Sequence, residues 1–243
     1  GSYNTFVGQD AGKGGTTSAP FSSGINNTAV GYQALDAFTT GDQNTAMGPS
    51  ALGGVTSGKG NIGIGYYGNS RTTTGDYNIS IGTEGYGTST GDYNITMGYR
   101  SMFTGHTVSR NIAIGHTSMY AIGGGSGYNI AIGHESMYGH SSAGAGSYNI
   151  AHGYRALYQV GVGSYNVAFG HNAGYQQLSG SNNTFVGYSA GHWATGSANT
   201  FMGYEAGKGG TTSAPYSSGI NNTGLGYRAL KGFTTGNNNT ALG

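Results

Sequence analysis

The sequence predicts an all-β protein: a parallel β-solenoid or β-roll of about fourteen short coils with a period of about 17 residues. A five-residue pattern carries this prediction. Asparagine, then Thr, Ile or once Val, a variable residue, a usually apolar residue and Gly recur fourteen times in 243 residues. Ten of the thirteen spacings between these asparagines are 16 to 18 residues. That length holds two short strands and their turns but not a helix and a turn.

We number each coil from its asparagine as position 0. The asparagines are Asn4, Asn27, Asn44, Asn61, Asn78, Asn94, Asn111, Asn129, Asn149, Asn166, Asn183, Asn199, Asn222 and Asn239. Their side chains are predicted either to form a stacked amide ladder or to serve as local turn formers. Glycine stands at position +4 in every coil, as in Gly31, Gly48, Gly65 and Gly82, and at −3 in twelve. We expect both sets to be turn residues with positive φ.

Positions +1 to +3 read as a short strand, and two of its columns have distinct compositions. Position +3 is apolar in thirteen coils, so this column is expected to form the core. His152 is the exception, and we expect a polar or hydrated spot in the core there, with an ion-binding site near a three-fold axis as the alternative. Position +2 is mostly small, and we interpret that column as a surface of contact between chains.

A longer repeat overlies the coils. Residues 1–48 match residues 196–243 at 35 of 48 positions. We therefore interpret 1–243 as a single repetitive fibre segment, with a super-repeat over 1–195 and a second copy beginning at 196. The sequence stops at the Gly of its fourteenth strand without a polar cap, which suggests a longer parent fibre. One coil offers few apolar side chains, so we expect lateral bundling as a homotrimer.

Composition excludes several classes of function. Charged residues make up 7%, and nine Lys and Arg nearly balance eight Asp and Glu, so no basic stripe can hold nucleic acid. There is no cysteine for disulfides or thiolate metal sites. No run of about 18 apolar residues predicts membrane insertion, and no leader opens the chain. Export as part of a longer chain, or delivery by virion assembly, is the expected route.

No residue set stands out as catalytic or metal-binding, and we expect no cofactor and no enzymatic activity. The acidic residues are scattered, and no nucleophile-elbow or phosphate-loop motif occurs. His116, His134 and His171 share position +5 with seven tyrosines. We interpret that column as flat side chains that stack, with a metal site as the alternative.

Ligand binding is the more serious possibility, because 20 Tyr and one Trp on a nearly neutral chain could stack on surface carbohydrate. The candidates are Trp193, His192, Tyr188 and Tyr204. A structural role for most of the aromatic residues is the alternative. The insertions 12–23, 139–146 and 207–218 are further candidates, since loops on a scaffold commonly carry binding.

The stretches "NTAVGYQAL" and "TTGDQNTAMG" (residues 27–35 and 39–48) resemble two related groups of sequences. One is the β-roll head of trimeric autotransporter adhesins, whose units are shorter. The other is the repeat of phage tail-fibre-like proteins, which is closer in length and wording. The resemblance spans the whole chain and implies an extracellular trimeric fibre on a virion or cell surface that attaches to a host. It carries over no receptor-binding residue.

Two other functions are left open by the sequence. One is a purely structural extracellular filament without a receptor. The other is ice binding, which uses flat threonine arrays on β-solenoids. Position +1 is Thr in the first three and last four coils but Ile or Val between them, and its partner column is apolar. That composition favours packing over ice binding.

Overall fold

The computed structural model describes residues 2–15, 22–87, 90–104, 107–123, 127–139, 146–177, 179–210 and 216–243. It confirms an all-β parallel solenoid with a repeat of about 17 residues. Each coil contributes one three-residue strand, and no helix occurs in the described ranges. The chain divides into two compact units, residues 1–117 and 118–243, each with seven strands.

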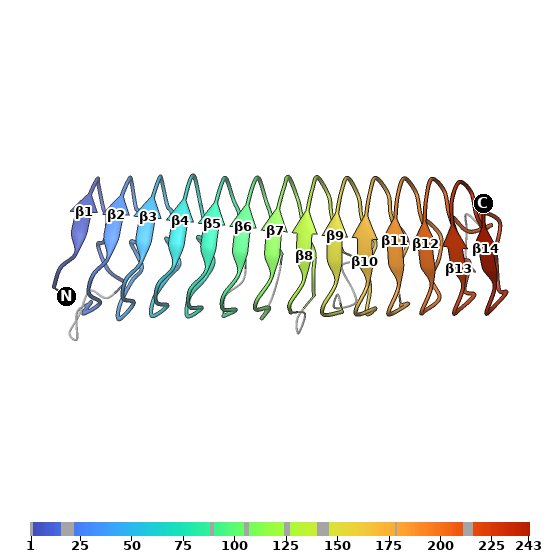
Figure 1. Cartoon of the computed structure of the whole chain (residues 1–243). Coiled ribbons are helices and arrows are strands. Elements are labelled where there is room, and N and C mark those ends of the chain that lie inside the picture. Colours follow the sequence, from blue (N-terminus) through green and yellow to red (C-terminus); the bar gives the residue numbers. More distant parts are fainter. Residues whose placement is uncertain are drawn as a thin grey trace. The chain divides into compact units, whose positions relative to one another are not determined.

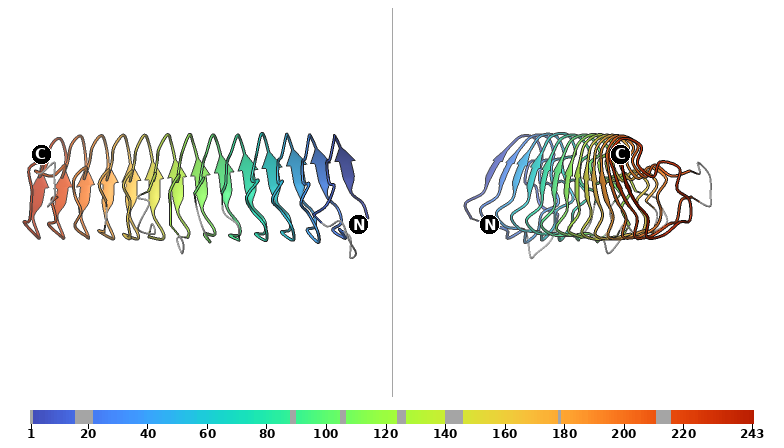
Figure 2. Two further views of the ribbon diagram at one scale, coloured as in Figure 1. Left: turned by 180° about the vertical axis from the view of Figure 1, so that it is seen from behind. Right: turned by 45° about the vertical axis from the view of Figure 1, so that its right-hand side comes forward.

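In each unit every strand pairs in parallel with the next, in chain order and at one fixed register (Figure 1). The first unit contains β1 (Thr5–Val7), β2 (Thr28–Val30), β3 (Thr45–Met47), β4 (Ile62–Ile64), β5 (Ile79–Ile81), β6 (Ile95–Met97) and β7 (Ile112–Ile114). The second contains β8 (Ile130–Ile132), β9 (Ile150–His152), β10 (Val167–Phe169), β11 (Thr184–Val186), β12 (Thr200–Met202), β13 (Thr223–Leu225) and β14 (Thr240–Leu242). The strands line one side of the coils, and the return segments form the opposite side (Figure 2).

The asparagines form a continuous buried ladder in each unit, and most of its bonds go to backbone. Asn166 shows the pattern. Its Oδ1 accepts the backbone N–H of Asn183 at 3.0 Å, and its Nδ2 donates to the carbonyl of Gly180 at 2.9 Å. In several coils, as between Asn44 and Asn27, the side-chain amides also bond each other. Of these bonds, the ladder alternative predicted from the sequence included only this last, side-chain contact. Each amide thus satisfies two buried backbone groups of the next coil.

The two sets of glycines are required for different reasons. At position +4 the backbone has positive φ, as in Gly31 at 135° and Gly170 at 134°. The expectation of positive φ is wrong for position −3. There a Cβ atom would collide with the next coil, as at Gly24, where it would lie 2.0 Å from the carbonyl oxygen of Gly41. Close stacking of backbones, and not turn geometry, requires these glycines.

The core of each unit lies behind the small column at position +2, so the expected roles of the +2 and +3 columns are reversed. Ala29, Ala46 and Ala168 are fully buried, whereas Val30, Met47 and Phe169 at position +3 are 37%, 47% and 40% exposed. His152 belongs to the exposed column and is therefore not a core residue. The core is narrow: a Cβ atom on Gly63 would lie 2.8 Å from Leu52 Cγ. Only small strand residues fit opposite the large side chains at position +8.

Many non-glycine residues adopt the left-handed conformation at three recurring positions, −1, +6 and +8. Gln43 at −1, Ser50 at +6 and Leu52 at +8 have φ of 59°, 54° and 51°. Such conformations cost about 1 kcal/mol or more each. The regular hydrogen bonds of the stack offset this cost, since each turn donates to the coil beside it.

Candidate binding surfaces

The outward side of the strands is an apolar face in both units. Position +1 carries only Thr, Ile and Val, and position +3 carries only aliphatic, Met or Phe side chains except for His152. None of these strand residues is buried at +1 or +3. Seven strands about 4.8 Å apart make a face about 30 Å long in each unit. We call these two columns the strand face.

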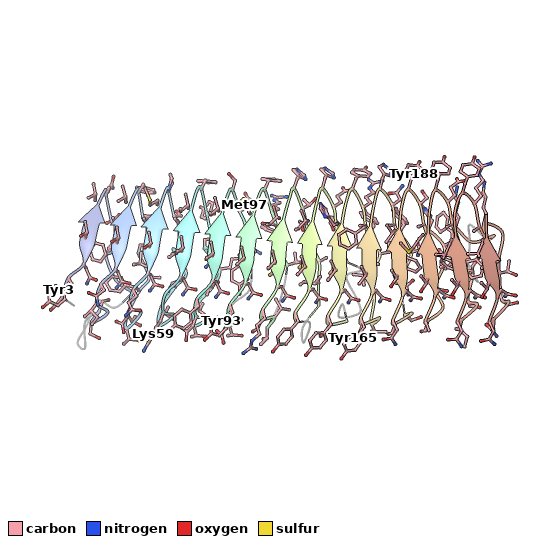
Figure 3. The ribbon with its side chains drawn as sticks, viewed as in Figure 1. Tyr3, Lys59, Tyr93, Met97, Tyr165 and Tyr188 are labelled. Atoms are coloured by element: carbon pink, nitrogen blue, oxygen red, sulfur yellow. The ribbon has the colours of Figure 1, made fainter. Side chains whose placement is uncertain are left out.

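An aromatic column borders the strand face at position +5. In the second unit all six residues of this column are Tyr or His, and neighbouring rings lie 4.8 to 5.4 Å apart. In the first unit Tyr99 and His116 continue the same arrangement at 5.1 Å. These contacts confirm the predicted stack of flat side chains. Tyr188 projects at this edge (Figure 3). Tyr165 projects at the opposite edge, where it belongs to a second stacked column at position −1.

The four predicted ligand-binding residues fall into two separate pairs. Tyr188 and Tyr204 stack at 5.1 Å in the +5 column and are 45% and 44% exposed. His192 instead occupies position +9, where its ring stacks on Tyr175 at 4.8 Å, and Trp193 lies beside it at 4.4 Å. No ring contact joins the two pairs within the described ranges. The candidates therefore do not converge on one site.

Trp193 is held by packing. The Trp193 ring stacks on Tyr216, with 5.8 Å between the ring centroids. A Cβ atom placed on Gly209 would lie 2.9 Å from the Cβ of Trp193. The neighbouring Ala194 forms a parallel bridge with Ser217, which fixes the end of the third insertion against this coil. The predicted binding loops themselves, at 16–21, 140–145 and 211–215, lie outside the described residues.

His192 is the most perturbed histidine of the described part. Burial lowers its pKa to about 4, and the nearby Lys208 charge adds to this effect. Its Nδ1 atom is buried without a hydrogen-bond partner. A neutral imidazole in an aromatic stack is therefore the stable form. The described residues contain no group of three His, Cys, Asp or Glu side chains able to hold a metal ion.

One carboxylate is surrounded by cations. Glu205, whose side chain is 8% exposed, bonds Lys208 at 2.6 Å, Lys231 at 2.8 Å and Arg228 at 3.0 Å. The hydrogen bonds from Lys208 and then Lys231 lower the pKa of Glu205 to about 2. Glu205 and Lys208 belong to the Asn199 coil, and Arg228 and Lys231 belong to the next one, so the cluster ties two successive coils of the second unit together. This cluster was not anticipated from the sequence, because Lys208, Arg228 and Lys231 lie 3, 23 and 26 residues after Glu205 and share no motif with it.

Comparisons of the chain with protein-family models, with curated proteins and with solved structures found no match. Along the described ranges there is no helix of sufficient length and hydropathy to cross a membrane. The candidate surfaces are therefore an apolar strand face, three stacked aromatic columns at positions −1, +5 and +9, and one cation-rich cluster.

Proposed function

We propose that the chain is a non-enzymatic segment of a homotrimeric extracellular fibre, of the tail-fibre or surface-adhesin type, that presents repeated binding surfaces to a host. The observation that carries this proposal is the exposed strand face. Soluble monomers rarely leave contiguous apolar patches of more than a few hundred Å² open to water. A surface of this kind in every coil calls for a partner of matching length.

A second copy of the same chain is the partner that fits. The strand face repeats at every coil, and only a partner with the same spacing can contact each coil in the same way. The columns carry no Lys, Arg, Asp or Glu, so two or three copies can meet without burying a charge. Bundling leaves the aromatic edge columns available. Many weak contacts along them would then add up to strong attachment through avidity.

The oligomeric state tests the proposal. Light scattering coupled to size exclusion should give three chains per particle. The double variant Met47→Lys with Met97→Lys places two charges on the strand face and should yield monomers. Gln43→Lys is the matched control, since Gln43 is exposed at position −1, off the strand face, and should leave the trimer intact. A wild-type chain that stays monomeric at about 100 µM, the range of weak specific association, would refute the bundled fibre.

A further inference from the structure

One coil of the first unit departs from the repeat and leaves a hollow in its surface. The coil of Asn78 has Gly85 at position +7 and Gly87 at +9, where the next coil has Ser101 and Phe103. Tyr86 between these glycines turns inward: it is 1% exposed, and its hydroxyl donates to the carbonyl of Gly91 at 2.9 Å. The coil therefore has no side chain at +9 to fill its share of the outer surface, and it also lacks the buried Ala or Ser side chain that most coils carry at +7.

The result is a cavity of about 290 Å³, and its walls come from three successive coils. Its lining includes Tyr67, Ser70, Arg71, Glu84, Arg100 and Phe103. Tyr67 is 40% exposed and packs edge-on against Tyr66 at 4.3 Å, which fixes its ring. No other coil has this combination of residues, since position +10 is Arg only at Arg71. The set of residues that lines the hollow is therefore not repeated in the other coils.

The charges of the hollow do not cancel. Arg100 pairs with Glu84, with 2.6 Å between Nε and Oε2. Arg71 makes no ion pair with any described carboxylate; its guanidinium lies over the ring of Phe103, 4.4 Å from the centroid. Stacking on an aromatic ring holds the guanidinium plane in place and leaves its edge N–H groups available. Arg71 is therefore a positioned cation without an anion.

We propose that this hollow binds a carboxylate-bearing sugar unit, of the uronic-acid type, within a surface polysaccharide. A guanidinium edge matches a carboxylate with two parallel hydrogen bonds. The exposed ring of Tyr67 provides an apolar surface for the C–H groups of a pyranose, while the Phe103 ring carries the guanidinium of Arg71. The Ser70 hydroxyl and the Glu84 carboxylate can pair with sugar hydroxyls. A volume near the lower end of small-ligand pockets suits one sugar unit of a chain.

The sugar site would give the proposed attachment function a ligand. It rests on that function only for the source of the sugar. Binding to the hollow is measured on the chain itself, whereas the fibre proposal is measured by the oligomeric state. A chain that forms trimers but does not bind the sugar would refute only the site. A chain that binds the sugar as a monomer would refute only the fibre.

Isothermal titration of the full chain with trigalacturonate, maltotriose and sodium sulfate tests the site. We expect millimolar or tighter binding of trigalacturonate, at least tenfold weaker binding of neutral maltotriose, and no competition by sulfate at equal ionic strength. Equal affinity for maltotriose would overturn the role of the carboxylate. Effective competition by sulfate would show a simple anion site and overturn the assignment to a sugar.

Two variants and one control assign the residues. Arg71→Gln should weaken trigalacturonate binding at least tenfold, the effect of losing a charge-assisted pair. Tyr67→Ser should weaken it severalfold without strain, because Ser50 has the same φ at the same position. Arg110→Gln is the matched control: it removes one exposed arginine at position −1, where Gln43 shows that glutamine fits. If Arg110→Gln and Arg71→Gln weaken binding equally, the effect is general charge and the site is refuted. Melting temperatures of all three variants should equal that of the wild type, because the three side chains are exposed.

Discussion

The ring of Phe185 occupies the space that a side chain at Gly191 would need: a Cβ atom there would lie 2.3 Å from Phe185 Cδ1. Phe201 and Gly207 have the same relationship at 2.1 Å, and Phe6 and Gly12 at 2.4 Å. In coils whose +2 residue is alanine, position +8 is usually leucine or methionine, as in Ala151 with Leu157. In each of these coils one large side chain fills a core layer of fixed width. It comes either from position +2 of the strand or from position +8 of the return segment.

A large residue at +2 goes with a small one at +8, and the reverse. We therefore predict that substitutions at Phe185 and Gly191 have strongly coupled effects on the free energy of unfolding. Phe185→Ala alone should cost about 3–5 kcal/mol through the cavity it leaves. Gly191→Leu alone should cost about 1–3 kcal/mol or more through overpacking. The double variant should recover most of both losses, because it recreates the layer of Ala151 and Leu157, where leucine has φ of 48°.

Urea unfolding of the four proteins in this cycle gives the coupling energy directly. Additive losses, with a double variant less stable than either single variant, would show that the two positions do not share one layer. The wild type, the two single variants and the double variant complete the cycle. No further reference variant, such as Ala194→Gly in the same coil, is therefore required.

The asparagine ladder predicts large losses from single amide deletions. Asn166→Ala removes the acceptor of the Asn183 N–H and the donor to the Gly180 carbonyl, and so leaves two buried backbone groups unpaired. We expect a loss on the order of 3 kcal/mol in the free energy of unfolding. Asn182→Ala is the matched control: Asn182 is exposed, and Ala198 has the same left-handed conformation at the equivalent position. Equal urea midpoints for the two variants would contradict a structural ladder.

The spacing of Asn and Gly predicted the solenoid and the strand at +1 to +3 of each coil, because stacked coils must keep one register. The second strand for which the repeat length left room does not form in the described residues, where turns follow instead. It did not predict which face of the strand is buried. Alternation defines two faces, and the larger apolar residues at +3 seemed to be the core. The narrow interior reverses this, and the pairing of Phe185 with Gly191 is the sequence signal that reveals it. The hollow near Arg71 was not predictable, because it depends on Tyr86 turning inward beside two glycines.

Because the pKa of His192 is lowered in the folded state, we expect the free energy of unfolding to fall in mild acid. The unfolded state takes up a proton near pH 6.5, whereas folded His192 stays neutral down to about pH 4. Between these values the unfolded state binds more protons, so stability falls as the pH falls. His192→Tyr, which continues the column of Tyr158 and Tyr175, should remove this contribution and flatten the melting temperature between pH 6.5 and 4. A His192→Tyr variant whose melting temperature still falls as steeply as that of the wild type between pH 6.5 and 4 would contradict this origin.

The lowered pKa of Glu205 predicts a second loss of stability, at more acidic pH. Its folded pKa of about 2 lies below the ordinary value of 4.5, so its contribution is fully present above pH 4.5 and is lost as the pH falls from 4.5 towards 2. Glu205→Gln leaves Lys208, Lys231 and Arg228 without their shared anion. We expect a loss of about 1–3 kcal/mol at pH 7 and a shallower decline of stability below pH 4.5. Asp42→Asn is the control, because Asn237 accepts the corresponding backbone N–H at 2.8 Å in the second copy of the motif. If Glu205→Gln melts like the wild type at pH 7, the three cations do not depend on the carboxylate, and the cluster does not stabilise the stack.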